Sequence, residues 1–352
     1  MELSDLKNKK VFITGHTGFK GTWLVLLLEE LGAVVRGYSL GVDKNSLFEL
    51  VKPKTESNVF GDIQDFSLLE KSIQEFKPDY IIHLAAQAYV DKSIIDPIGT
   101  FNTNIIGLAN ILKIACDIEE LKSILVVTSD KCYKNTEKGI PYVESDELGA
   151  QDPYSTSKAC QELIAESYRF SYFGKKGIPV PISTARASNV IGGGDFILSR
   201  LVPYLLDSFA NNQIPVIRNP YAVRPWQYVL DVLTGYLKLL LAMEKEYSLA
   251  GAYNFGPEKD GIRDVRDLSI AMAKYFGNST FNITENKLSS YETKILMLDS
   301  SKAKEKLKWK PIYNFDKTIE TISLFTQRYY QNENIKTLCK EQIDAYFRNM
   351  GY

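Results

Sequence analysis

The sequence has little of what several common protein classes require. It contains four cysteines and only two histidines in 352 residues. The cysteines, Cys116, Cys132, Cys160 and Cys339, are widely scattered. This pattern excludes a disulfide framework and a zinc site, so we expect reduced thiols and no metal. The longest apolar runs, such as residues 23–28, are far too short to span a bilayer.

An excess of charge of one sign is also missing. The 42 basic and 43 acidic residues nearly cancel, leaving a net charge of −1. Broad attraction to nucleic acid or to an anionic membrane is therefore not expected, although a local basic pocket for a phosphorylated small molecule is compatible with this balance. Residues 1–15 pass from a short charged lead into a strand without a signal-peptide apolar region. We expect a soluble, cytoplasmic protein.

What the chain does contain is an alternation of short β-branched runs with amphipathic segments. Near-continuous apolar strands separated by helices are typical of a parallel sheet covered on both faces. We therefore predict an α/β fold with a doubly wound, mostly parallel sheet of the Rossmann type. The predicted strands are residues 10–15, 34–40, 58–63, 80–86, 123–129, 180–188 and 252–257, and the predicted helices are 21–32, 67–76, 103–116 and 154–173.

The sequence pattern changes after about residue 188, where Pro, Gly and Asn become frequent and the alternation of strands and helices becomes irregular. We interpret this part as a smaller, mixed α/β lobe that binds substrate. The predicted division is a dinucleotide-binding domain over 1–188 with returning segments at about 226–257, and a substrate-binding lobe with C-terminal helices over 189–225 and 258–352.

Three glycines, Gly15, Gly18 and Gly21, lie three residues apart between the first strand and the first helix. Glycine permits a tight turn and a close approach to a pyrophosphate, whose charge then faces the helix N-terminus. This spacing predicts dinucleotide binding. The phosphate loop of NTPases is excluded because Lys20 precedes Gly21, so the Gly-Lys-Ser/Thr ending is missing.

NAD is the expected cofactor, and NADP stays open. The second strand ends without the acid that holds the ribose hydroxyls of NAD; Asp43 follows a little later, whereas Arg36 or Ser39 could accept a 2′-phosphate. The predicted cofactor contacts are Gly15, Thr17, Gly18, Phe19, Lys20, Gly21, Asp62, Ile63, Ala85, Ala86, Gln87, Asn104, Tyr154 and Lys158. We expect His16 to cap the backbone or meet solvent, and His83 to be a hydrogen-bonded core residue.

Tyr154 and Lys158 lie four residues apart in a predicted helix and therefore on one face. A tyrosine is about one part in a thousand ionised at neutral pH, a cost of about 4 kcal/mol. A lysine cation about 4 Å away, at an effective dielectric constant of about 20, offers roughly 4 kcal/mol. Tyr154 can then act as a base on a sugar hydroxyl, with Ser129 bonded to the same oxygen.

A dehydrogenase or an epimerase needs no more than this, yet Asp130 and Lys131 follow Ser129 directly. Oxidation of C4 of a hexose acidifies the C5 proton, and its loss with the C6 hydroxyl eliminates water. That step needs an acid for the hydroxyl and a base for C5. Adjacent residues of a regular strand point to opposite faces, so both side chains reach the sugar only if the strand end turns.

These motifs resemble the nucleotide-sugar 4,6-dehydratases of the extended short-chain dehydrogenase/reductase superfamily, and they favour CDP-glucose as substrate. The similarity covers nearly the whole chain; its most specific stretches are "TSDKCYKN" and "RNPYAVRPWQYVLDVLTGYL". It implies NAD-dependent oxidation of C4, loss of water across C5–C6 and return of the hydride to C6, in the synthesis of deoxysugar precursors of lipopolysaccharide O-antigen. Ser129, Tyr154 and Lys158 would perform the redox step, and Asp130 would be the general acid.

The resemblance also suggests roles for further residues. Lys131 stands where other 4,6-dehydratases carry Glu, and we hypothesise that it is the C5 base or organises that base. The predicted nucleotide-sugar contacts are Asn189, Arg218, Arg224 and Tyr228. A homodimer is expected through a four-helix bundle formed by residues 100–117 and 154–172 of each subunit.

Three alternatives stay open at this stage. The chain could dehydrate a GDP-, UDP- or dTDP-sugar, or it could be a nucleotide-sugar 4-epimerase, which would need Tyr154 and Lys158 but not Asp130 and Lys131. A non-catalytic dinucleotide-binding regulator is the most remote alternative, because such proteins tend to lose the Tyr–Lys pair.

Overall fold

The computed structural model describes residues 2–173, 180–277, 279–284 and 295–352. A central sheet of seven strands has the order β10-β6-β5-β4-β1-β2-β3, and every pairing in it is parallel. The strands are β1 (Lys10–Thr14), β2 (Val34–Ser39), β3 (Ser57–Phe60), β4 (Tyr80–His83), β5 (Ser123–Val127), β6 (Ile182–Ala187) and β10 (Ala252–Phe255). This confirms the predicted doubly wound sheet. The strand order reverses between β1 and β4, where such sheets bind ligands at the carboxyl ends of the strands.

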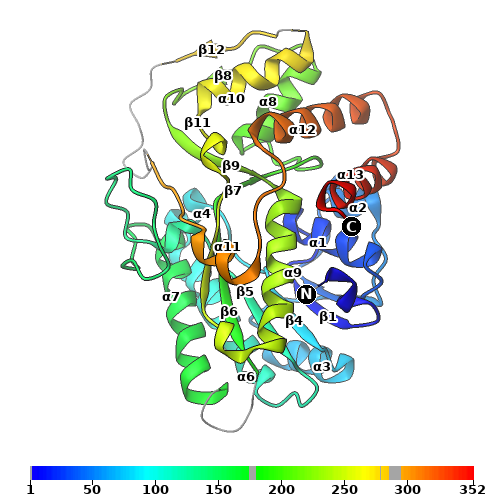
Figure 1. Cartoon of the computed structure of the whole chain (residues 1–352), viewed down its shortest axis with the longest axis vertical. Helices are drawn as coiled ribbons and strands as arrows, with labels where there is room; N and C mark the ends of the chain where they lie inside the picture. Colours follow the sequence, from blue (N-terminus) through cyan, green and yellow to red (C-terminus); the bar gives the residue numbers. More distant parts are fainter. Residues whose placement is uncertain (1, 174–179, 278, 285–294) are drawn as a thin grey trace.

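Helices cover both faces of this sheet (Figure 1). Along β1, Val11 and Ile13 pack into the hydrophobic core shared with α1 and α9, whereas Phe12 packs into the core shared with α3 and α6. This alternation is what a strand buried on both faces requires. The helices around the sheet are α1 (Phe19–Glu30), α2 (Leu47–Val51), α3 (Phe66–Phe76), α4 (Val90–Ile95), α5 (Pro97–Phe101), α6 (Gly107–Ala115), α7 (Pro153–Tyr168) and α9 (Val229–Lys245).

A smaller lobe lies over the carboxyl edge of the sheet, at the top of Figure 1. Its three-stranded sheet has the order β11-β9-β7, with one antiparallel and one parallel pairing, and a second sheet pairs β12 with β8. This is the predicted mixed α/β lobe. Its elements are β7 (Asn189–Ile191), β8 (Val216–Ile217), β9 (Val223–Tyr228), β11 (Ile262–Asp264), β12 (Asn282–Ile283), α8 (Leu201–Ala210), α10 (Val265–Ala273) and α12 (Phe315–Tyr330).

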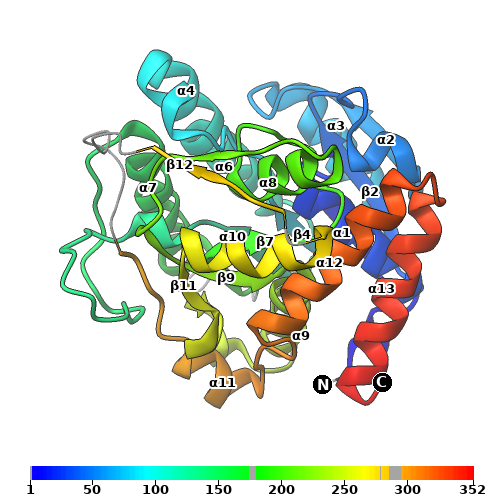
Figure 2. The same ribbon diagram turned by 90° about the horizontal axis from the view of Figure 1, so that it is seen from above.

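The chain crosses between the two parts more than once. After β9, helix α9 and strand β10 return to the central sheet. Helix α11 (Ser301–Leu307) then packs on α9 and β10, and α13 (Ile335–Met350) packs on α1 and α2, as Figure 2 also shows. These C-terminal helices therefore contact the part of the chain that carries the central sheet, whereas the prediction grouped them with the second lobe. Within the described ranges, no helix is both long and apolar enough to cross a bilayer.

Asp231, in the first turn of α9, joins this C-terminal return to the core. Its side chain is 1% exposed. One carboxylate oxygen accepts hydrogen bonds from the Ile312 amide at 2.6 Å and the Tyr346 hydroxyl at 2.8 Å, and the other accepts one from the Tyr313 amide at 3.4 Å. Asp231 thus connects α9 to residues 312–313 and to α13.

Replacing Asp231 with Ala should lower the free energy of unfolding by about 3 kcal/mol or more, because the buried donors lose their acceptor. Burial raises the pKa of Asp231 to about 7 from its ordinary value of 3.8. The native state therefore binds a proton at Asp231 more tightly than the unfolded state does. The stability that comes from this proton is lost as the pH rises through about 7.

Urea titrations at about pH 5 and about pH 8 should show a larger loss for Asp231→Ala at the lower pH. The control is Asp117→Ala, which removes only the exposed ion pair with Lys113 and should cost less than about 1 kcal/mol. Equal losses in the two variants would contradict the role assigned to Asp231.

Candidate active site

The glycine turn after β1 combines two crowded glycines with one open glycine. Gly15 has a φ of +73°, and a Cβ there would lie 2.8 Å from the Ala85 backbone nitrogen. A Cβ at Gly21 would lie 2.2 Å from the Gly15 carbonyl oxygen. Gly18 has no such neighbour, because a Cβ there would meet only the Gly15 oxygen at 3.5 Å.

The open space at Gly18 lies at the N-terminus of α1. Gly18 is the N-cap of α1, and no side chain caps this end. The first amide groups of α1 therefore face a site at the reversal point of the sheet, where a pyrophosphate fits both the space and the helix dipole. The residues present thus fit the predicted dinucleotide.

The predicted cofactor contacts lie in the segments that follow β1, β3 and β4, at the start of α1, and on the helical segments with Asn104 and Tyr154. The Thr17 hydroxyl donates to the Gly41 carbonyl at 2.8 Å. Asn104 is fully buried; its side chain accepts from the Gln87 amide at 2.8 Å and donates to Ser157. Ala85, Ala86 and Gln87 follow β4, Asp62 and Ile63 follow β3, and Phe19 and Lys20 begin α1. Their contacts with a cofactor stay predictions.

Strand β2 carries Arg36 and Ser39, the two residues that could accept the 2′-phosphate of NADP. Arg36 pairs with Glu56 through two bonds of 2.9 Å, and its guanidinium lies 4.8 Å from the centre of the Phe76 ring. Arg36 is therefore engaged with its neighbours on β3 and α3 and is not available for a 2′-phosphate. The Ser39 hydroxyl bonds to the Nδ1 atom of His16 at 2.9 Å.

Both histidines are buried in the structure. His16 bonds to Ser39 and to Asn58 and also interacts with the backbone of Tyr38, so the expectation of a solvated residue is wrong, whereas a contact with the backbone is present. His83 lies in the core as predicted, with Nδ1 bonded to Thr14 at 2.8 Å. Its Nε2 has no hydrogen-bond partner among the described residues, and burial lowers the pKa of His83 to about 3. His83 is therefore neutral.

The strand end at β5 turns, as the elimination chemistry requires. Residues Asp130–Cys132 form a short 3₁₀ turn, η3. The Ser129 hydroxyl accepts from the Lys131 amide at 3.2 Å and donates to Asp130 at 3.0 Å. Ser129 and Asp130 are 9% and 6% exposed. The turn lets neighbouring side chains reach the same region.

Helix α7 brings Tyr154 to this turn. Asp152 caps the helix by accepting from the Ser155 amide at 2.9 Å, and Pro153 occupies its first turn. Burial raises the pKa of Tyr154 to about 12, while a hydrogen bond with Ser129 acts in the opposite direction and the charge of Asp130 acts with burial. Tyr154, Ser129 and Asp130 therefore share one site.

Asp130 lies in an environment that favours its protonated form. Burial raises the pKa of its carboxyl group, and the charges of Lys131 and Arg224 and a hydrogen bond from Ser129 oppose the shift. A raised pKa suits a carboxyl group that acts as a general acid toward a leaving hydroxyl.

The ammonium group of Lys158 has partners other than Tyr154 in the structure, and its action on Tyr154 stays a prediction. Its ammonium group donates to the Val127 carbonyl at 3.2 Å and to Gln161 at 2.8 Å. Burial, followed by the charge of Lys20, lowers the pKa of Lys158 to about 7. Among the interactions that lower the pKa of Tyr154, the hydrogen bond with Ser129 has the largest effect. The spacing of the pair is as predicted, but the partner of the lysine is different.

Two further cations lie near the same groups. Burial and the nearby charge of Arg200 lower the pKa of Lys20 to about 8, and the charge of Asp130 opposes this shift. Arg200 pairs with Asp195 at 2.9 Å and interacts electrostatically with Tyr154. The sequence analysis missed Arg200; its position at the N-cap of α8, just after the glycine-rich segment 192–194, was the available signal.

The small lobe carries the predicted substrate contacts. Asn189 lies in β7 beside Trp226 of β9. The positive charge of Arg224 in β9 opposes the rise in the pKa of Asp130. Arg218 is exposed in the loop after β8. Tyr228 is fully buried, its hydroxyl donates to Gln342 at 2.8 Å, and its ring stacks on Tyr313. The prediction of Tyr228 as a substrate contact is therefore wrong, because its side chain belongs to the core.

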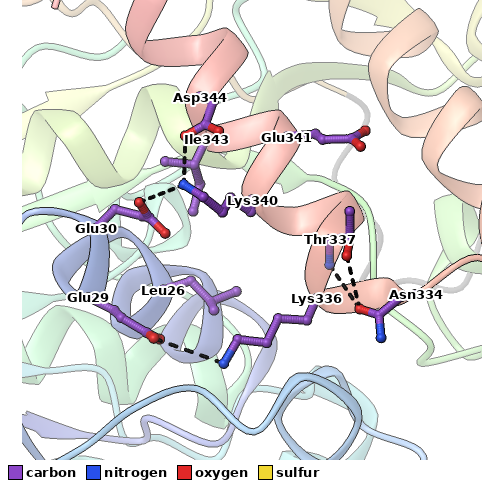
Figure 3. Close-up of a pocket in the computed structure, with 10 residues that line it drawn as sticks. All are labelled: Leu26, Glu29, Glu30, Asn334, Lys336, Thr337, Lys340, Glu341, Ile343 and Asp344. Atoms are coloured by element: carbon purple, nitrogen blue, oxygen red, sulfur yellow. Dashed lines mark hydrogen bonds and ion pairs between the residues drawn. The ribbon is translucent and has the colours of Figure 1, made fainter.

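A surface pocket of about 370 Å³ lies between α1 and α13. Figure 3 shows its lysines paired across the gap, Lys336 with Glu29 and Lys340 with Glu30, while Lys340 also pairs with Asp344 of its own helix. It lies at the far end of α1 from the glycine turn, and no predicted site residue lines it. Within the described part of the chain, His, Cys, Asp and Glu side chains form no cluster that could hold a metal ion.

The parallel sheet, the glycine turn and the Ser–Tyr–Lys constellation together define a protein of the short-chain dehydrogenase/reductase class. The family model described as "GDP-mannose 4,6 dehydratase" matches residues 12–322, so the chain belongs to this family of nucleotide-sugar dehydratases. It is 39% identical over 347 residues to the CDP-glucose 4,6-dehydratase of Salmonella typhimurium, covering 97% of this chain and 96% of that protein.

Other relatives are more distant. The dTDP-glucose 4,6-dehydratase of Xanthomonas campestris is 26% identical, covering 87% of this chain and 90% of that protein. Among solved structures, the dTDP-glucose 4,6-dehydratase of Bacillus anthracis in complex with NAD has a TM-score of 0.76 at 21% identity, covering 92% and 97% of the two chains. The epimerase Mth375 of Methanothermobacter thermautotrophicus has a TM-score of 0.79 at 22% identity, covering 96% of each chain. These structures share the fold.

The glycine turn predicts a separation of stability from cofactor affinity. Gly18→Ala should leave the melting temperature nearly unchanged, since a Cβ there meets no close neighbour, but should weaken NAD binding about tenfold or more. Gly21→Ala should lower the melting temperature, because its Cβ would overlap the Gly15 carbonyl. Thermal unfolding and calorimetric titration with NAD measure the two effects. Unchanged NAD affinity in Gly18→Ala would contradict this assignment.

Proposed function

We propose that this chain is an NAD-dependent CDP-glucose 4,6-dehydratase that converts CDP-glucose to CDP-4-keto-6-deoxyglucose. The choice of CDP-glucose is supported by the similarity to the Salmonella enzyme, at 39% identity over nearly the full length. Matches to dTDP-glucose enzymes are weaker, at 26%. The product would supply deoxysugar precursors of lipopolysaccharide O-antigen.

The redox half of the reaction uses Tyr154 and Ser129. NAD, held at the glycine turn of Gly15, Gly18 and Gly21, would supply the hydride acceptor for C4 and the hydride donor for C6. Tyr154 takes the proton of the C4 hydroxyl, and Ser129, bonded to the phenol, orients the same oxygen. Lys158 donates to the Val127 carbonyl and to Gln161 beneath the site, and its lowered pKa of about 7 lets it release or take up a proton near neutral pH.

The observation that carries the dehydratase assignment is the buried carboxyl group of Asp130 beside Ser129 and Tyr154. It donates a proton to the departing C6 hydroxyl, and the environment that favours its protonated form suits this role. An epimerase has no leaving hydroxyl and needs no such acid. Lys131, the next residue in the turn and only partly buried, is the candidate base for the C5 proton.

The cationic residues of the small lobe suit the substrate diphosphate. Arg224 faces the site near Asp130, and Arg218 is exposed in the loop between β8 and β9. Guanidinium groups bind phosphate oxygens through paired hydrogen bonds. With Asn189 on the neighbouring strand, they are our candidates for holding the nucleotide.

A homodimer is supported by apolar side chains exposed on the predicted bundle helices. These are Ile106 of the π-helical segment η2 (Asn102–Ile106), Leu163 of α7, and Phe170 and Tyr172 of the π-helical turn η4 (Arg169–Phe173). Pairing of these faces would remove them from water. A cytoplasmic location is supported by the four cysteines, which form no disulfide within the described residues and two of which are fully buried.

The defining experiment is incubation of the purified protein with NAD and CDP-glucose in deuterated water. We expect a 4-keto-6-deoxy product with deuterium at C5 and no net formation of NADH. Parallel incubations with UDP-, GDP- and dTDP-glucose test the nucleobase. An epimer that retains its C6 hydroxyl would reject the proposal, and preference for another nucleotide would reject the choice of CDP.

Lys131→Met should abolish C5 proton exchange while leaving formation of reduced cofactor detectable, because the redox residues stay intact. Proton NMR in deuterated water and absorbance at about 340 nm follow the two events. Lys134→Met is the matched control, since Lys134 is exposed and pairs with Glu147 outside the site; it should behave as wild type. Normal C5 exchange in Lys131→Met would remove Lys131 from the role of base.

A further inference from the structure

A buried ion pair joins strand β6 to helix α7, next to the strand β5 that leads into the catalytic residues. Arg186 of β6 donates to Glu162 of α7 at 2.8 Å, and both side chains are 3% exposed. An isolated pair at this depth is costly to desolvate and stabilises little on its own. Its further partners therefore indicate what it does.

Glu162 binds the chain just before the catalytic turn, which we define as residues 129–132. The Thr128 hydroxyl donates to one carboxylate oxygen of Glu162. The Thr184 hydroxyl of β6 donates to the other oxygen at 2.5 Å. Glu162 also lies one helical turn after Lys158, which itself lies one turn after Tyr154, so the carboxylate is part of the face of α7 that carries the chemistry.

Arg186 binds the chain just after the catalytic turn. Its guanidinium donates to the Tyr133 hydroxyl at 2.7 Å and lies 4.8 Å from the centre of the Tyr133 ring. The Tyr133 hydroxyl in turn donates to Asn254 of β10 at 2.8 Å. Tyr133 is 1% exposed. One residue of the ion pair therefore binds each flank of the turn.

We propose that Glu162 and Arg186 are positioning residues that clamp both ends of the catalytic turn, holding Ser129 and Asp130 in register with Tyr154 on α7. The kinetic test of this inference rests on the proposed function, because it measures turnover of CDP-glucose. A turn clamped at only one end could shift relative to α7, and a displacement of about 1 Å at a reacting group can cost about 100-fold in rate.

The test uses variants that leave the ion pair in place. Thr128→Val and Tyr133→Phe each remove one hydroxyl between the clamp and the turn. Thr184→Val is the matched control: it removes a hydroxyl bonded to the same carboxylate, but Thr184 flanks no catalytic residue. We expect similar losses of melting temperature in Thr128→Val and Thr184→Val, since each loses one buried hydrogen bond.

The kinetic outcome separates positioning from stability. In Thr128→Val and Tyr133→Phe, kcat for CDP-glucose should fall about tenfold or more while KM changes less than about threefold. Thr184→Val should keep kcat within about twofold of wild type, and Thr128→Ser, which restores the hydroxyl, should recover it. Equal kcat losses in Thr128→Val and Thr184→Val, or an unchanged kcat in Thr128→Val, would overturn the clamp.

A second readout does not depend on the reaction. Hydrogen–deuterium exchange of peptides spanning residues 123–135 should be faster in Thr128→Val and Tyr133→Phe than in wild type, and unchanged in Thr184→Val. If the wild-type protein turns over no nucleotide sugar, the proposed function fails, and this measurement alone decides the clamp. Exchange that is unchanged in the first two variants, or equally raised in all three, would overturn it.

Discussion

Seven strands that all run in one direction bring their carboxyl ends to a single edge of the sheet, and every feature of the site depends on that arrangement. The glycine turn follows β1, the Ala85–Gln87 segment follows β4, and Ser129 and Asp130 follow β5. These segments are far apart in the chain but adjacent in the sheet. The small lobe closes over the same edge, so the groups that could hold a nucleotide sugar face the groups that could transform it.

Burial determines the electrostatics of this edge. It raises the pKa of Asp130 and Tyr154 and lowers that of Lys20 and Lys158, so each group is shifted toward its neutral form. At neutral pH this brings the acid and base forms of Lys20 and Lys158 closer in free energy than they are in water, whereas it moves those of Tyr154 further apart. The charges that oppose these shifts come from neighbours such as Arg224, Lys131 and Glu162, which connects the chemistry to the packing around it.

Burial also determines how the polar groups beneath the catalytic turn are arranged. Buried ions are stable only when their hydrogen bonds are satisfied. The carboxylate of Glu162 meets this condition through Thr128, Thr184 and Arg186. The bonds that satisfy the carboxylate also join β5, β6 and α7. The hydrogen bonds that compensate for the desolvation of Glu162 therefore also constrain the position of the catalytic side chains.

The sequence alone determined the local features: the strands and helices of the doubly wound sheet, the turn at Gly15, Gly18 and Gly21, and the one-turn spacing of Tyr154 and Lys158. Each follows from periodicity or from the geometry of one element, within a few residues along the chain. Only the tertiary structure decided the side-chain partners. It placed Tyr228 in the core, turned Lys158 toward Val127 and Gln161, buried His16 against Asn58, and brought Arg200 near Tyr154. Those environments are made by residues distant in sequence, so no local pattern encodes them.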